Sequence, residues 1–170
     1  MLVALTVFSC SSGQSKVEDT DRGYIVKIGQ TAPDFTAKLT DGSTFSLAEN
    51  RGKVVMLQFT ASWCGVCRKE MPHIESEIWQ SLKDKGLVLV GIDRNEPMEK
   101  AKDFASKMSI SYPLAPDENS EIFTLYARKD AGVTRNVIID KNGKIVFLTR
   151  LFDKDEFSEM IETIKKLLEE

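Results

Sequence analysis

The sequence lacks the features of several large classes of protein. Its 170 residues carry 23 lysines and arginines against 26 aspartates and glutamates, so the formal net charge is −3 and no basic excess exists to neutralise nucleic-acid phosphates. It also lacks a run of about 20 apolar residues, the length that a membrane-spanning helix needs. We therefore expect no nucleic-acid partner and no membrane-spanning helix in the chain as given. The length suits one domain.

Cysteine and histidine are too scarce for a zinc site or a disulfide framework. The chain contains Cys10, Cys64, Cys67 and one histidine, His73. A structural zinc site takes four ligands of these types at close spacings, and a framework of structural disulfides needs more cysteines. We therefore expect no metal and no bound cofactor. The redox-active group would be a disulfide between Cys64 and Cys67, unless these are two core cysteines that merely lie close together.

The N-terminal residues have the pattern of a targeting segment. Residues 1–9 are almost wholly apolar, and Cys10 follows Ser9, which resembles the end of a bacterial lipoprotein signal. No lysine or arginine precedes the apolar run, so a clipped signal peptide with an incidental cysteine is the alternative. We expect a signal remnant over 1–9, a lipid-attachment cysteine and flexible tether over 10–25, and a domain over 26–170. The redox site would then face an oxidising, extracytoplasmic compartment in a bacterium, the periplasm or the cell surface.

Alternating strand and helix patterns predict an α/β domain whose mixed central sheet has helices on both faces. Strands are predicted over 35–39, 44–47, 54–60, 87–93, 136–140 and 144–149, and helices over 64–83, 97–108, 121–127 and 155–168. Asp41-Gly42 and Asn142-Gly143 are typical of hairpin turns. Ser120 is predicted to cap the helix over 121–127.

The sequence Trp63-Cys64-Gly65-Val66-Cys67 joins a predicted buried strand to a predicted helix. Both cysteines then lie in the first helical turn, where unpaired N–H groups and the helix dipole stabilise a thiolate. A thiolate is the species that attacks a disulfide. We expect Cys64, at the exposed edge, to attack and Cys67 to resolve the mixed disulfide. Trp63 would shape access to the site, and Gly65 would leave room for a substrate backbone.

Several segments together resemble one protein family. The matching segments are Ala32-Pro33-Asp34-Phe35, Asp41-Gly42, Arg51-Gly52-Lys53-Val54-Val55 and the stretch from Trp63 to Pro72. From about Val26 onward the chain resembles the TlpA/ResA-like branch of the thioredoxin superfamily, close to AhpC/TSA and redoxin proteins. The resemblance implies a thioredoxin-like three-layer sandwich with an N-terminal β-hairpin and a central helical insertion. It also implies a membrane-tethered thiol–disulfide oxidoreductase that reduces protein disulfides and is fed by a membrane electron donor.

The resemblance assigns roles to two further residues. Glu70 matches an acidic residue that the family places near the active site, one turn after the second cysteine. A carboxylate there could accept a proton from Cys67 or tune the thiolate. The alternative is an exposed charge that is favourable early in a helix. Pro72 matches the proline that kinks this helix.

Two positions depart from the family pattern. Thioredoxins proper carry a buried aspartate six residues before the first cysteine, whereas this chain has Gln58, which cannot take a proton. Thr134 stands where the family usually has a cis-proline, so either the Val133–Thr134 bond is cis or the loop is rebuilt. Because this loop contacts the substrate in thioredoxin folds, substrate recognition is affected. Arg135 either lowers a thiol pKa or, as we expect, points to solvent.

Two other functions remain open. A thiol peroxidase usually has a Pro-x-x-x-Thr-x-x-Cys loop and an arginine over the reactive thiol. Here Thr60 precedes Cys64 by four positions rather than three, Met56 stands at the proline position, and Arg135 could be the arginine, although nothing in the sequence places it over the thiol. A binding module that merely retains the fold is the non-catalytic alternative. The Trp-Cys-x-x-Cys sequence favours disulfide exchange over both.

Overall fold

The computed structural model describes residues 22–170. The predicted signal remnant over 1–9, the lipid-attachment residue Cys10 and the tether as far as residue 21 lie outside the described residues. Within residues 22–170, no helix is long and apolar enough to cross a membrane.

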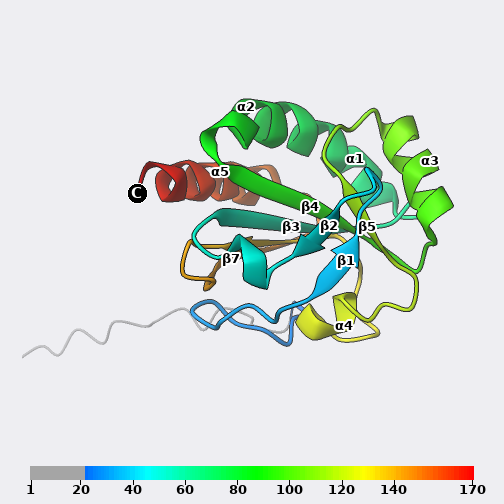
Figure 1. The fold of residues 1–170 in the computed structure, drawn as a ribbon, viewed down its shortest axis with the longest axis horizontal. Helices are drawn as coiled ribbons and strands as arrows, with labels where there is room; N and C mark the ends of the chain where they lie inside the picture. Colours follow the sequence, from blue (N-terminus) through cyan, green and yellow to red (C-terminus); the bar gives the residue numbers. More distant parts are fainter. Residues whose placement is uncertain (1–21) are drawn as a thin grey trace, which may run out of the picture.

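A five-stranded mixed sheet in the order β5-β4-β3-β6-β7 forms the centre of the domain (Figure 1). Its strands are β3 (Val54–Thr60), β4 (Leu87–Arg94), β5 (Leu114–Asp117), β6 (Arg135–Ile139) and β7 (Ile145–Arg150). The central strand β3 is buried at every position and pairs in parallel with β4 and antiparallel with β6. The carboxyl end of β3 therefore lies beside the carboxyl end of β4 and the amino end of β6. We call these strand ends the redox edge, because β3 continues from them to Cys64. The name does not refer to the outer strands β5 and β7.

The two faces of the sheet are covered differently (Figure 1). One face packs against α1 (Gly65–His73), the π-helical η2 (Ile74–Trp79), α2 (Gln80–Leu82), α3 (Met98–Met108) and α5 (Lys154–Glu169). The other packs against the hairpin of β1 (Thr36–Lys38) and β2 (Thr44–Ser46), the 3₁₀ turn η1 (Ala48–Asn50) and the one-turn helix α4 (Phe123–Tyr126). The three-layer arrangement, the N-terminal hairpin and the central insertion that contains α3 are confirmed. On the second face the hairpin replaces most of the expected helical cover.

The helix after the redox pair is less regular than we predicted. Cys64 is its N-cap rather than its first residue, and the α-helical pattern gives way to a π-helix at Ile74. A 3₁₀ turn, η3 (Lys83–Lys85), then ends it before Gly86. Pro72 lies inside α1 and has no N–H to donate, so the regular ladder is interrupted close to where the π-helix starts.

The central insertion contains two features that we predicted wrongly. β5 was missed because it is a short edge strand of four residues that includes Pro116, a residue that edge strands tolerate. Ser120 does not cap the next helix with its side chain. Instead, the Asp117 carboxylate accepts hydrogen bonds from the backbone N–H groups of Ile122 (3.0 Å) and Phe123 (2.8 Å). The Ser120 hydroxyl contacts Arg94 (3.0 Å).

Residues 22–25, which we assigned to the tether, pack on the domain instead. Arg22 donates two hydrogen bonds to the Glu156 carboxylate at 2.5 and 2.8 Å. The Tyr24 hydroxyl donates to the carbonyl of Thr149 (2.6 Å) and lies 3.1 Å from that of Asn136, which can share the same proton. These contacts fix residues 22–24 against the ends of β6 and β7 at the redox edge, so the ordered domain includes them.

Candidate active site

Cys64 and Cys67 form a disulfide at the start of α1, with their Cα atoms 5.3 Å apart. The two sulfurs differ in access, because Cys64 is 9% exposed and Cys67 is fully buried. The backbone N–H of Cys67 donates to Cys64 Sγ at 3.2 Å. Once reduced, a Cys64 thiolate would accept this hydrogen bond at the positive end of the helix dipole. The geometry thus suits Cys64 for attack and Cys67 for resolution.

The residues around Cys64 leave it open on one side. Trp63 is 54% exposed, Gly65 is exposed and Val66 is half-buried. A Cβ atom added at Gly65 would meet no atom within 4 Å, so the space in front of the helix start is free. Gly65 therefore adds no bulk beside Cys64.

Thr134 contacts both sulfurs of the disulfide. Its Oγ1 lies 3.2 Å from Cys64 Sγ and 3.2 Å from Cys67 Sγ, and the residue is 4% exposed. No peptide bond among the described residues is cis, so the Val133–Thr134 bond is trans and the loop is rebuilt. The Thr134 carbonyl accepts a hydrogen bond from the Leu151 N–H at 3.1 Å, which ties the loop to the end of β7.

We expected Arg135 to point to solvent, and this expectation is wrong, because the residue is fully buried. Side chains alternate along β6, so Thr134 and Asn136 face α1 while Arg135 points to the opposite face of the sheet. Its guanidinium donates to the carbonyls of Gly132 (2.9 Å) and Arg22 (2.7 Å) and lies 4.6 Å from the Tyr24 ring centre. Arg135 therefore holds the loop before Thr134 in place.

Glu70 lies on the buried face of α1, with 1% of its surface exposed. The exposed-charge alternative is therefore wrong. Burial raises the pKa of Glu70 from 4.5 to about 7, although the hydrogen bond from Asn136 Nδ2 to Oε1, at 2.7 Å, opposes the shift. Glu70 lies one helical turn after Cys67, on the same side of α1. A carboxyl with a pKa near neutrality can take up or release a proton under physiological conditions.

Gln58 occupies the position of the missing aspartate and is completely buried. Its Oε1 accepts a hydrogen bond from the Tyr112 hydroxyl at 2.7 Å, and its side chain also helps to lower the pKa of Glu70. Gln58 itself carries no titratable proton, whereas its neighbour Glu70 does. Asn136 was missed by the sequence analysis, although the two-residue period of a strand places it on the same face as Thr134.

Two further buried acids, Glu96 and Asp93, lie near the loop before Cys64, and we did not predict either of them. Glu96 is fully buried and accepts hydrogen bonds from the Ser62 N–H (2.6 Å) and the Ser62 hydroxyl (2.5 Å). Its carboxylate also forms an ion pair with Lys100 (2.7 Å). Burial raises its pKa, but these partners outweigh burial and lower the pKa overall. Asp93, at the end of β4, shows the reverse: burial and the nearby Glu96 raise its pKa to about 8.

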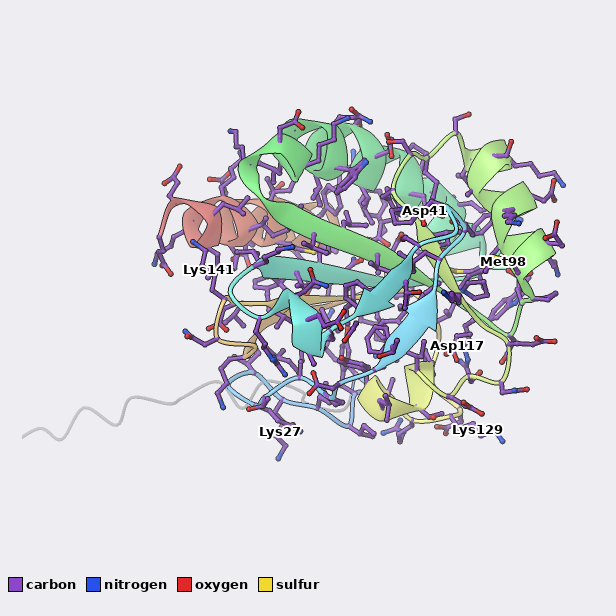
Figure 2. All side chains as sticks on the ribbon, viewed as in Figure 1. Lys27, Asp41, Met98, Asp117, Lys129 and Lys141 are labelled. Atoms are coloured by element: carbon purple, nitrogen blue, oxygen red, sulfur yellow. A yellow bond between two sulfur atoms is a disulfide. The ribbon has the colours of Figure 1, made fainter. Side chains whose placement is uncertain are left out.

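The structure offers little to hold a metal or small ligand near the cysteines. Within residues 22–170, no group of three or more histidine, cysteine, aspartate or glutamate side chains could bind a metal ion. Two hollows of about 300 and 370 Å³ lie around Met98, between the β1–β2 hairpin and α3, and neither is lined by a cysteine. Figure 2 shows Asp41, Met98 and Asp117 along this side of the molecule. A macromolecule that brings its own disulfide fits the open site better than an enclosed small molecule.

Comparison with known proteins gives one consistent family. Residues 28–148 match the AhpC/TSA family. Thiol-disulfide oxidoreductase ResA of Geobacillus thermodenitrificans is 30% identical over 141 residues, which cover 82% of this chain and 79% of that protein. ResA of Oceanobacillus iheyensis is 32% identical over 149 residues, covering 85% and 73%.

Solved structures agree with this assignment. A putative protein disulfide isomerase from Bacteroides thetaiotaomicron is 57% identical, with a TM-score of 0.84 over 87% of this chain and 94% of that one. A putative thiol:disulfide interchange protein DsbE from Chlorobium tepidum is 26% identical, with a TM-score of 0.74 over 84% and 99%. The chain therefore belongs to the AhpC/TSA family, and it is a thiol–disulfide oxidoreductase of the TlpA/ResA-like type.

Proposed function

We propose that this oxidoreductase is a membrane-tethered reductase of protein disulfides in an extracytoplasmic compartment. The observation that carries the chemistry is the unequal burial of the two cysteines, since Cys64 keeps 9% of its surface exposed and Cys67 keeps none. The direction of electron flow rests on the resemblance to TlpA/ResA-like proteins. The tether and the compartment rest on the lipoprotein-like pattern at residues 1–10.

The reaction has two exchange steps. The Cys64 thiolate attacks a substrate disulfide, one substrate sulfur leaves as a thiolate, and a mixed disulfide forms. Cys67, as a thiolate, then attacks Cys64 Sγ, which releases the second substrate thiolate and closes the Cys64–Cys67 disulfide. A dithiol donor, which we place at the membrane, returns two electrons by the reverse sequence.

Glu70 is the proposed proton acceptor for Cys67 in the second step. Cys67 is fully buried, and a thiol is a poor nucleophile until it loses its proton. The Glu70 carboxyl, whose pKa is about 7, is the titratable group one turn away on the same helix. The proton can pass directly or through a water molecule, and the acid returns it when Cys67 is reduced again.

A peroxidase reaction finds no support in the geometry of Arg135. That reaction needs a cation beside the peroxidatic thiol, and Arg135 was the candidate that the sequence offered. Its guanidinium instead contacts Gly132, Arg22 and Tyr24 on the other face of the sheet. We therefore retain disulfide exchange as the function.

Trapping tests the proposal. In bacteria that produce the full chain, Cys67→Ser removes the thiol that resolves the mixed disulfide. Substrates should therefore accumulate in mixed disulfides with Cys64, from which a reducing agent releases them. The matched control, Cys64→Ser with Cys67→Ser, should capture none. Membrane fractionation of the same cells should find the protein with the membranes, and Cys10→Ser should release it. If wild type reduces protein disulfides while Cys67→Ser captures no partner, the assigned order of attack is wrong.

A further inference from the structure

Thr134 is the polar side chain closest to the reacting atoms, and the proposed reaction gives it no role. Its hydroxyl lies at the same distance, 3.2 Å, from Cys64 Sγ and Cys67 Sγ. A hydroxyl has one proton to donate and can rotate it about the Cβ–Oγ1 bond. From this position the hydroxyl can donate a hydrogen bond to either sulfur without movement of the backbone.

The backbone around Thr134 is held from three directions. Its carbonyl accepts from Leu151, which itself has a left-handed backbone with φ +65°. The buried guanidinium of Arg135 fixes the carbonyl of Gly132 on one side and that of Arg22 on the other. Because Thr134 is also 4% exposed, bulk water competes little for its hydroxyl. The donor is thus placed in advance of the reaction.

We infer that Thr134 is a catalytic residue whose hydroxyl donates a hydrogen bond to whichever sulfur of the pair carries the negative charge. The inference deepens the proposed function and takes the order of its steps from it. Hydrogen bonds to an ionised sulfur are stronger than those to a disulfide sulfur, so the donation lowers the energy of each thiolate as it forms.

The charge changes sulfur during one cycle. When a donor thiolate attacks Cys64 Sγ, a new S–S bond forms there, the Cys64–Cys67 bond breaks, and its electron pair stays on Cys67 Sγ. When the donor's second thiolate resolves that mixed disulfide, the electron pair is left on Cys64 Sγ, and the donor leaves as a disulfide. The Cys67 N–H can serve only Cys64, at 3.2 Å, whereas the Thr134 hydroxyl reaches both sulfurs.

A proline at this position cannot perform this role, because it has neither a hydroxyl nor an N–H. The exchange of the usual family proline for Thr134 therefore supplies a hydrogen-bond donor in place of a rigid apolar contact. The consequence is a larger thiolate fraction on Cys64 and a Cys64–Cys67 disulfide that is easier to reduce.

The test compares Thr134→Val, which keeps the shape and loses the hydroxyl, with Thr134→Ser, which keeps the hydroxyl. The full chain is made with Cys10→Ser and Cys67→Ser, so that Cys64 is the single thiol, and its thiolate is titrated by ultraviolet absorbance. We expect Thr134→Val to lower the thiolate fraction and the alkylation rate of Cys64 about tenfold at pH near 7, and Thr134→Ser to stay within about twofold of the unsubstituted Thr134 protein. With Cys67 restored, Thr134→Val should shift the equilibrium with glutathione toward the Cys64–Cys67 disulfide.

Thr134→Ala provides a second variant without the hydroxyl if Val disturbs folding, which circular dichroism checks. Equal thiolate fractions with Thr134 and in the Thr134→Ser, Thr134→Val and Thr134→Ala variants would overturn the inference. So would a Thr134→Ser variant whose thiolate fraction matches that of Thr134→Val. The titration needs no substrate, so its result is independent of the proposed function. Absence of disulfide reductase activity in wild type would instead count against the proposed function alone.

Discussion

Glu70 and Glu96 lie on opposite sides of the strand that leads to Cys64, and both are buried. Glu70 contacts Asn136 at the β6 side, whereas Glu96 follows β4 and contacts Ser62. Glu70 accepts one short amide hydrogen bond and its pKa rises to about 7. Glu96 accepts two hydrogen bonds from Ser62 and an ion pair from Lys100, and its pKa falls.

The difference shows that burial alone does not decide the charge of a carboxyl group. Loss of hydration raises the pKa of both glutamates, and the number of donors and cations around each one determines the outcome. A carboxyl that is poorly compensated exchanges its proton near neutral pH and suits proton transfer. A well-compensated carboxylate keeps its charge and suits a fixed support for the loop before Cys64.

The largest effect that would separate the two glutamates is on rate. Glu70→Gln should slow resolution of the mixed disulfide by roughly two to three orders of magnitude at pH near 7, because an amide cannot accept the Cys67 proton. The rate should also lose its inflection near the Glu70 pKa of about 7. Single-turnover reduction of a protein disulfide across pH measures both. Glu77→Gln, an exposed position on the following π-helix, is the control; a wild-type pH profile in Glu70→Gln would contradict the role.

The next effect is on stability. A carboxyl whose pKa is higher in the folded than in the unfolded state costs stability once it ionises, so the contribution of Glu70 falls as pH rises from 4.5 to about 7. At pH about 8, Glu70→Gln should raise the free energy of unfolding by up to about 3 kcal/mol and flatten its decline with pH. Denaturant unfolding at several pH values measures this. Asp93, whose pKa is about 8, should leave a residual slope in the variant. A Glu70→Gln protein that is less stable than wild type at this pH would refute the prediction.

The smallest effect has the opposite sign. Because the pKa of Glu96 is lowered on folding, its contribution is present above the unfolded pKa and is lost as pH falls through the folded pKa. Glu96→Gln should therefore lower the free energy of unfolding by about 2 kcal/mol at neutral pH, with a smaller difference in acid. Ser62→Ala, which removes one of the hydrogen bonds to Glu96, should have a smaller effect in the same direction. Equal stability of Glu96→Gln and wild type at neutral pH would show that Glu96 does not support the loop.

The contrast also explains what the sequence could predict. Glu70 follows the cysteines by one helical turn, so a resemblance and a helix pattern place it at the site. Glu96 reaches Ser62 because Asn95 has a left-handed backbone, with φ +59°, which turns the chain back after β4. The hydrophobic periodicity of the sequence does not predict such a turn.

Long-range partners account for the other surprises. The long apolar runs of β3 and β4 were recognisable, because buried central strands read as continuous hydrophobic segments. The buried guanidinium of Arg135 donates to the carbonyl of the distant Arg22, and the Thr134 carbonyl accepts from Leu151 at the end of β7. Such contacts between segments far apart in sequence are not encoded in local spacing.

The position of Arg22 at the redox edge has a practical consequence for handling this protein. Arg22 bonds to the carbonyl of Arg150, close to where Leu151 meets the Thr134 loop. In contrast, α5 starts after this edge and carries the C-terminus along its 16 residues, about 24 Å away; Figure 1 shows the C-terminus far from α1. A purification tag, fluorophore or sensor surface is therefore best joined at the C-terminus, where it lies far from α1 (Figure 1).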